Sequence, residues 1–269
     1  MKAPVVVLGA TGIVGSGVVR GAIETGWPVI AVARDSGKLA QLRPAHPDAD
    51  LTVLEAEIAS DTDGAQLAAA LRELGRPVAG VIDAMSDNSG RGRLLDHPAS
   101  ELRRTLDDDL LPHLSAARHL VRLLAEANRS GSYVLISGPG SELPWAGYGY
   151  RSVAGAALRM MACVLHDEAR SLPVRVQLLL VDAPVRDELP CRHACPEWPS
   201  AAAIGRRALQ LIERSNANEP ARAVVHYARG VDSAAAQTTT SRREHTDVRS
   251  FLKGLSSLDR NEVFPDDTP

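Results

Sequence analysis

The sequence predicts one α/β domain of the doubly wound type, with about seven parallel strands and helices on both faces of the sheet. Short runs of β-branched residues alternate with Ala/Leu-rich stretches along residues 3–230, which is the order of a strand–helix–strand fold. The runs are apolar throughout, as is typical of strands covered on both faces. A glycine-rich turn joins the first run to the first helical stretch, as in nucleotide-binding domains.

Seven apolar runs are the expected strands, at 4–9, 28–33, 51–55, 78–84, 132–137, 174–182 and 222–227. Apolar residues that recur every three or four positions predict helices between them. These helices are expected at 13–25, 61–74, 99–128, 152–171 and 199–214. Pro112 should interrupt the third helix, because proline lacks an N–H group and clashes with the preceding turn.

The chain is expected to divide into a folded domain, residues 1–232, and a polar tail, residues 233–269. The tail is poor in large apolar residues, apart from a short amphipathic stretch at 247–258, and reads as a linker or disordered segment. That stretch is predicted to form a short helix that docks on its own domain or on a partner subunit.

Composition excludes several classes of function. The net charge of the 269-residue chain is -3, which argues against nucleic-acid binding. We expect no secretory signal and no membrane span, since no apolar run approaches the ~20 residues that a bilayer requires. The three cysteines are typical of a reducing cytoplasm rather than a disulfide framework.

The turn after the first strand predicts a dinucleotide site. Gly9, Gly12 and Gly15 follow one another at three-residue spacing in LGATGIVG. The first allows a tight turn, the second lets a pyrophosphate approach the backbone, and the third lets helix and strand pack closely. Thr11 and Ile13, in the same turn, are expected to contact the nucleotide.

The residue after the second strand favours NADP(H) over NAD(H). NAD sites usually carry an acidic residue there, which binds the ribose 2′-hydroxyl. This chain has Arg34, whose planar guanidinium suits a 2′-phosphate. Asp35 follows directly and weakens the preference, and the alternative is an arginine that is simply solvated.

Together these motifs resemble the short-chain dehydrogenase/reductase (SDR) family over residues 3–230. The matching segments are LGATGIVG, VARDSGKL, EAEI, DAMS and HDEARSLPVRVQLLLVDAPV. The resemblance implies a Rossmann-type fold that binds a nicotinamide dinucleotide. It also implies further cofactor contacts, at Glu57, Ile58, Ala84, Met85, Pro184 and Val185.

The resemblance also locates the family's catalytic serine, tyrosine and lysine, and this sequence departs from them. When SVAGAAL is matched to the family's SASKAAL, the tyrosine falls on Arg151, the lysine on Gly155 and the serine on Gly138. The family's helix asparagine falls near Asp109. No other register supplies the lysine, because none lies between Lys38 and Lys253.

Neighbouring residues offer a substitute. Tyr148 or Tyr150 would act as the acid/base, with its pKa lowered by the positive charge of Arg151. Ser137, or alternatively Ser141, would orient a carbonyl group. The alternative is that both tyrosines only line the wall of a pocket.

Two functions follow. One is a divergent oxidoreductase that transfers a hydride between NADP(H) and a small carbonyl, alcohol or acyl substrate. The other is a non-catalytic NADP(H) sensor or partner-binding regulator, similar to the NmrA-like atypical members. The family resemblance implies a homodimer or homotetramer formed through the helices at 99–128 and 152–171. No metal is expected, although Cys191, His193 and Cys195 are zinc-type ligands.

Overall fold

The structure is a computed structural model that describes residues 2–86, 92–127, 130–187, 197–213 and 221–227. The chain divides into two units, Met1–Arg229 and Gly230–Pro269, and all described residues belong to the first. The expected tail at 233–269, with its helix at 247–258, therefore lies outside the described residues.

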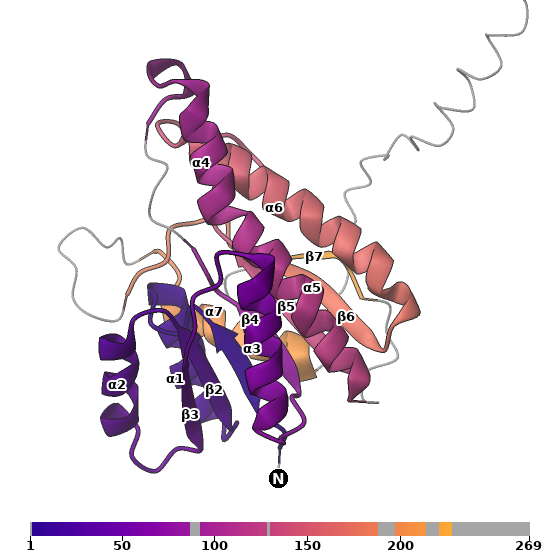
Figure 1. Ribbon diagram of the computed structural model, residues 1–269. Helices are drawn as coiled ribbons and strands as arrows, with labels where there is room; N and C mark the ends of the chain where they lie inside the picture. The colour runs from indigo at the N-terminus through magenta and orange to yellow at the C-terminus, as the bar shows by residue number, and fades with distance from the viewer. Residues whose placement is uncertain (1, 87–91, 128–129, 188–196, 214–220, 228–269) are drawn as a thin grey trace, which may run out of the picture. The chain divides into compact units, whose positions relative to one another are not determined.

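A seven-stranded sheet forms the centre of the first unit, in the order β3-β2-β1-β4-β5-β6-β7 (Figure 1). Every neighbouring pair is parallel. The strands are β1 (Val5–Leu8), β2 (Val29–Ala33), β3 (Leu51–Glu55), β4 (Gly80–Asp83), β5 (Gly131–Ser137), β6 (Val174–Leu180) and β7 (Val224–His226). The predicted fold class is confirmed, and each predicted strand end is within about two residues of the observed one.

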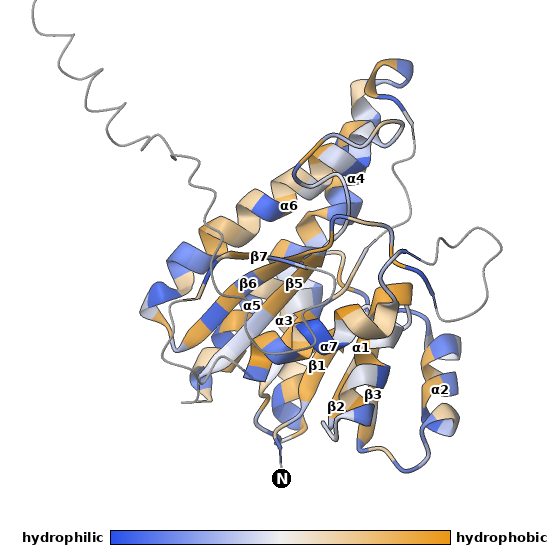
Figure 2. Ribbon diagram, turned by 180° about the vertical axis from the view of Figure 1, so that it is seen from behind, coloured by the Kyte–Doolittle hydropathy of each residue, from blue (hydrophilic) through white to orange (hydrophobic). Residues whose placement is uncertain are grey.

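Helices cover both faces of the sheet. The helices are α1 (Ile13–Glu24), α2 (Ser36–Ala45), α3 (Asp61–Glu73), α4 (Ala99–Asp109), α5 (Leu111–Glu126), α6 (Gly149–Glu168) and α7 (Ala201–Glu213), with 3₁₀ turns η1 (Leu94–Asp96) and η2 (Ala169–Ser171). Side chains from α3, α5 and α6 form one core with the sheet, and those from α1, α2 and α7 form the other. Figure 2 shows this second face, with α1 and α7 over the apolar strands.

Two helical details differ in how well the sequence revealed them. The predicted interruption of the third helix is present, since α4 ends at Asp109 and α5 begins at Leu111 with Pro112 in its first turn. Helix α2 was not expected, because Leu39 is its single buried residue and no apolar stripe marks it. Its start is fixed by Asp35, whose carboxylate accepts a hydrogen bond from the Lys38 N–H at 2.9 Å.

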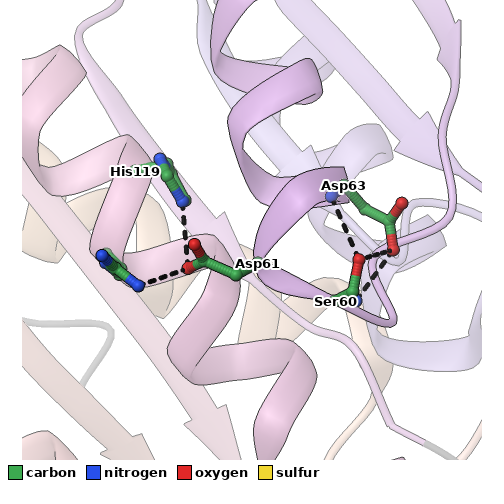
Figure 3. Close-up of polar contacts among 5 residues, drawn as sticks. Ser60, Asp61, Asp63 and His119 are labelled. Atoms are coloured by element: carbon green, nitrogen blue, oxygen red, sulfur yellow. Dashed lines mark hydrogen bonds and ion pairs between the residues drawn. The ribbon is translucent and has the colours of Figure 1, made fainter.

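The start of α3 is held both within the helix and against α5 (Figure 3). Ser60 and Asp63 form a reciprocal capping box. Hydrogen bonds from the Ser60 hydroxyl and the nearby backbone keep the pKa of Asp63 below its usual value. Asp61 accepts from Arg118 at 2.9 Å and lies 3.1 Å from the His119 ring nitrogen. Polar contacts therefore attach α3 to α5 at the edge of their shared apolar contact.

Helices α1 and α7 approach so closely that side chains are excluded between them. A Cβ on Gly17 would collide with the backbone of Ala201, and one on Gly205 would lie 2.6 Å from the Gly17 carbonyl oxygen. Helix α7 therefore packs directly beside α1 on the same face of the sheet.

Candidate functional site

The candidate site lies at the carboxyl edge of the sheet, where β1 and β4 are neighbours. From this point the chain winds outward in both directions, toward β3 and toward β7. Ligands of open α/β sheets bind in the crevice at such a topological switch point. The turn that follows β1 and the segment that follows β4 are therefore its first two components.

The turn after β1 is shaped by close backbone contacts. Gly9 has φ +70°, a left-handed conformation that glycine adopts without strain. A Cβ there would lie 2.8 Å from the carbonyl oxygen of Ala84 and 3.0 Å from the Cα of Met85. A Cβ on Gly15 would collide with the Gly9 carbonyl oxygen. The turn thus brings β1, β4 and α1 together in a way that side chains would prevent.

The start of α1 has the properties of an anion site. Gly12 caps the helix without a side-chain hydrogen bond, and no acidic residue lies in the first turn. Its first N–H groups are therefore left for a ligand, and the helix dipole favours negative charge there. Thr11 is half-buried, and Ile13 is 48% exposed, which leaves an apolar side chain at the mouth of the turn. In this cradle the free N–H groups fit the pyrophosphate of a dinucleotide, and the apolar side chain fits one of its flat rings.

The end of β2 presents Arg34 to solvent. Within the part of the chain that the structure describes, Arg34 has no hydrogen bond or ion pair. Asp35 is instead engaged as the cap of α2, and the hydrogen bond from the Lys38 backbone keeps its pKa low. The Ala56 N–H donates to the Ala33 carbonyl at 3.0 Å. This hydrogen bond places the next residue, the exposed Glu57, at the same end of the sheet.

Beneath this edge lies a buried polar network that the sequence did not reveal. Asp83, the last residue of β4, is fully buried. Its Oδ2 accepts from the Tyr133 hydroxyl at 3.0 Å and lies 2.9 Å from His113 Nδ1. Its Oδ1 accepts from the Met85 N–H at 3.2 Å. One carboxylate therefore joins β4, β5, α5 and the segment that touches the glycine turn.

The network shifts the titration of both of its partners. Burial by itself lowers the pKa of His113, but the attraction of Asp83, with a smaller part from Asp109, outweighs it and raises that pKa. Burial first, and the negative Asp83 second, raise the pKa of Tyr133 well above its ordinary value. The sequence signal was a lone acid at the end of an apolar strand; nothing in its spacing identified His113 and Tyr133 as partners.

The loop after β5 is filled by its own side chains. The hydroxyls of Ser137 and Ser141 are hydrogen-bonded at 2.5 Å, and Ser141 also donates to the Gly138 carbonyl at 2.8 Å. Both serines are buried. A Cβ on Gly155 would lie 2.6 Å from Ser141 Oγ. The helix position that resembles the family's lysine therefore packs directly against the serine pair.

The two tyrosines have different surroundings. Tyr148 is half-buried and stacks on Trp145, with ring centroids 4.0 Å apart. Tyr150 is 3% exposed and meets the edge of His97 at 6.0 Å between ring centroids. Arg151 is half-buried, and no side chain of the described residues forms a hydrogen bond or ion pair with it.

The segment after β6 completes the edge. Pro184 and Val185 are half-buried, and the next residue, Arg186, donates its N–H to the Pro199 carbonyl at 3.0 Å. This bond ties the segment to the start of α7. Cys191, His193 and Cys195 lie outside the described residues, and no group of three or more His, Cys, Asp or Glu in the described ranges is arranged to hold a metal. In the same ranges, no helix is long and apolar enough to cross a membrane.

The structure thus brings Gly9, Gly12, Gly15, Ala84 and Met85 into one cradle. It places Arg34 and Glu57 at the ends of β2 and β3, and it gathers Ser137, Tyr148, Tyr150 and Arg151 around the loop after β5 and the start of α6.

Comparison with known sequences shows a match over most of this unit. The sequence profile of the short chain dehydrogenase family matches residues 3–182. No curated protein matches the chain significantly.

Solved structures with the same fold are numerous. A short-chain dehydrogenase/reductase from Mycobacterium ulcerans is 18% identical with a TM-score of 0.73, covering 84% of this chain and 88% of that one. An NADPH-bound short chain oxidoreductase from Pseudomonas aeruginosa PAO1, described as containing an atypical catalytic center, is 16% identical with a TM-score of 0.72, covering 87% and 98%. A short chain dehydrogenase from Burkholderia cenocepacia in complex with NADP is 17% identical with a TM-score of 0.69, covering 98% of both chains.

Proposed function

This chain belongs to the short-chain dehydrogenase family, and from that premise we propose that it is a divergent NADP(H)-dependent oxidoreductase. It binds the dinucleotide pyrophosphate in the glycine cradle at the start of α1. It transfers a hydride between the nicotinamide and the carbon of a small carbonyl or alcohol substrate. The observation that carries the proposal is the cradle itself, in which Gly9 and Gly15 leave no room for a side chain and α1 begins uncapped.

Arg34 is the proposed determinant of NADP(H) preference. Its guanidinium is exposed and unpaired within the described residues, while the neighbouring Asp35 caps α2. A 2′-phosphate would receive charge-assisted hydrogen bonds from Arg34, and NAD(H) has no group to receive them. The same coenzyme types occur in the complexes of the Pseudomonas and Burkholderia proteins.

For the chemical step we propose that a tyrosine at the start of α6 supplies the proton to the substrate oxygen as the hydride reaches the carbon. Tyr148 is the better candidate because it is less buried than Tyr150. Arg151, in the same helical turn, is the proposed charged partner of that tyrosine. Ser137 would position the carbonyl oxygen, after exchanging its bond to Ser141.

A second function is favoured by one specific observation. Gly155, at the place that resembles the family's lysine, is packed against Ser141, so the usual proton relay has no side chain there. A protein that binds NADP(H) without turning it over, as a sensor or partner-binding regulator, needs the cradle but not that lysine.

Nucleotide titration tests the first half of the proposal. NADPH and NADH are titrated into the full chain by fluorescence, together with Arg34→Ala and the control Arg43→Ala on α2. Loss of the arginine contacts should weaken NADPH binding roughly tenfold and leave NADH binding unchanged, and Arg43→Ala should match the unmodified protein. If neither nucleotide binds at millimolar concentration, both functions are wrong.

Turnover distinguishes the two functions. NADPH oxidation is followed at saturating nucleotide against a panel of carbonyl compounds, with Tyr148→Phe and Tyr150→Phe as variants. A tyrosine that supplies the proton should lose roughly 100-fold or more in kcat when its hydroxyl is removed. Tight NADPH binding with no consumption against any carbonyl would instead favour the regulator.

We also propose a homodimer or homotetramer formed through α5 and α6. Exposed apolar side chains lie on the outer faces of these helices: Leu111, Leu114, Met160 and Val164. Light scattering on the purified chain should give a mass of two or four subunits, and a monomer at micromolar concentration would contradict this assembly.

A further inference from the structure

Arg151 is a half-buried guanidinium at the start of α6. Within the described part of the chain it has no hydrogen-bond or ion-pair partner. None of its guanidinium nitrogens is among the buried, unpartnered polar atoms of the described residues, so they are open to an acceptor from outside the chain. The surroundings of Arg151 decide what that acceptor could be.

The helix geometry points Arg151 toward the serine loop. Gly155 directs its Cβ position at Ser141 Oγ. Arg151 precedes Gly155 by four residues. Relative to the Cβ direction of Gly155, its Cα–Cβ bond is therefore rotated by only about 40° around the helix axis and displaced about 6 Å toward the helix start. Ser152 fixes the adjoining stretch, because its hydroxyl accepts from the Trp145 N–H at 3.0 Å. The Arg151 side chain therefore starts on the side of α6 that faces the loop after β5, at the carboxyl edge of the sheet.

The charges near this loop do not neutralise Arg151. Ser137 and Ser141 are neutral and bonded to each other. Glu142, the acid in the loop, lies 3.7 Å from His226 Nδ1 at the end of β7. Among the described residues of this loop, the guanidinium is thus one positive charge next to neutral hydroxyls.

We propose that Arg151 binds a carboxylate of the substrate, so that the compound presented to the nicotinamide is an oxo acid or the corresponding hydroxy acid. This inference rests on the proposed oxidoreductase function. The planar fork of arginine matches a carboxylate through two parallel hydrogen bonds. A single positive charge balances a carboxylate, whereas a phosphate dianion would need a second cation.

The test compares matched ligands on the full chain. Acetoacetate, its methyl ester and dihydroxyacetone phosphate are titrated calorimetrically, with saturating NADP+ and again without nucleotide. Arg151→Gln removes the charge and Arg151→Lys keeps it without the fork. The control is Arg159→Gln, which changes another half-buried arginine two turns further along the same helix.

Acetoacetate should bind roughly 10- to 100-fold more tightly than its ester. Arg151→Gln should abolish that difference, Arg151→Lys should retain part of it, and Arg159→Gln should retain all of it. NADP+ affinity should change less than twofold in every variant, which also shows that the variants are folded.

Equal binding of acid and ester would overturn the inference, as would an acid preference that survives Arg151→Gln or tighter binding of the phosphate ester. A loss of NADP+ affinity in Arg151→Gln with no change in acid preference would assign Arg151 to the nucleotide and also overturn it. Failure of NADP+ to bind the unmodified protein would count against the proposed function, and the titrations without nucleotide would still decide the role of Arg151.

Discussion

The turn after β1 and the loop after β5 leave the same edge of one sheet and each leads into a helix, yet they are built in opposite ways. The first is made of backbone, with Gly9 and Gly15 in contact where no side chain fits. The second is made of side chains that bond and stack on one another, such as Ser137 on Ser141 and Trp145 on Tyr148. The first leaves polar groups free for a ligand, and the second satisfies most of its own.

This difference separates two requirements of a nicotinamide enzyme. Binding the dinucleotide needs a backbone shape, which only a few residue types allow. Acid/base chemistry needs particular side chains at particular distances. A chain can therefore keep the first while the second is rebuilt around different residues.

The largest predicted difference between the two regions comes from replacing one glycine in each of them by alanine. Gly15→Ala should destabilise the protein by roughly 3–5 kcal/mol and abolish NADPH binding, because the new Cβ collides with the Gly9 carbonyl. Gly138→Ala is the matched change in the loop after β5, where a Cβ meets nothing within 4 Å. It should leave both properties nearly unchanged. Urea unfolding and NADPH titration measure the two effects, and equal effects in the two variants would contradict the contrast.

The Asp83 network lies between the two regions and should show the next largest effect. His113→Leu leaves the Asp83 carboxylate buried with Tyr133 and the Met85 N–H as its remaining partners. Removing one partner of a buried charged pair costs about 3 kcal/mol or more. Urea denaturation of the variant and the unmodified protein at pH 6 measures this cost, and a difference below about 1 kcal/mol would show that the pair is not charged.

The same network predicts how stability depends on pH. The pKa of His113 is raised in the folded chain above its ordinary value of 6.5, so between the two values the folded state binds the extra proton. The contribution of His113 to the free energy of unfolding is fully present below pH 6.5 and is lost as the pH rises through the raised pKa. The urea midpoint should therefore fall from pH 6 to pH 9, with a smaller fall in His113→Leu. Parallel pH profiles in the two proteins would rule out this origin.

The smallest predicted change in stability is that of Gly155→Ala, and its sign should reverse when Ser141 is also replaced by alanine. In the unmodified protein Gly155→Ala places a Cβ 2.6 Å from Ser141 Oγ and should cost about 1 kcal/mol. In a Ser141→Ala background the Oγ is gone, and the remaining contacts, at 3.3 Å to the Cα and Cβ of residue 141, require only a shift of a few tenths of an ångström, so alanine should stabilise the helix by up to about 1 kcal/mol. Thermal unfolding of the four proteins forms a double-mutant cycle, and additive effects would mean that Gly155 and Ser141 do not compete for space.

The fold and the cradle could be predicted because each is written in local patterns. Apolar runs identified all seven strands, and Pro112 located the break between α4 and α5. Glycine spacing identified the turn at Gly9, where backbone contacts exclude side chains. Helix α2 was not predicted, because it buries little and its start depends on the Asp35 cap, which is a single residue rather than a repeating pattern.

The side-chain contacts could not be predicted, because they join residues far apart in the chain. Asp83 meets His113 and Tyr133 across intervals of 30 and 50 residues. Gly155 was matched to the family's lysine from sequence, but its contact with Ser141 depends on how the loop after β5 folds back on α6. No spacing rule links such pairs.

The close contact of α1 with α7 can form only late in the synthesis of the chain, because the two helices are far apart in sequence. The backbone of Ala201 occupies the space that a side chain on Gly17 would take, and Ala201 leaves the ribosome long after the glycine turn has emerged. At roughly 5–20 residues per second, the N-terminal half waits on the order of ten seconds or more without the helix that covers it. During that time the side of α1 that packs on α7 in the finished fold lacks its partner.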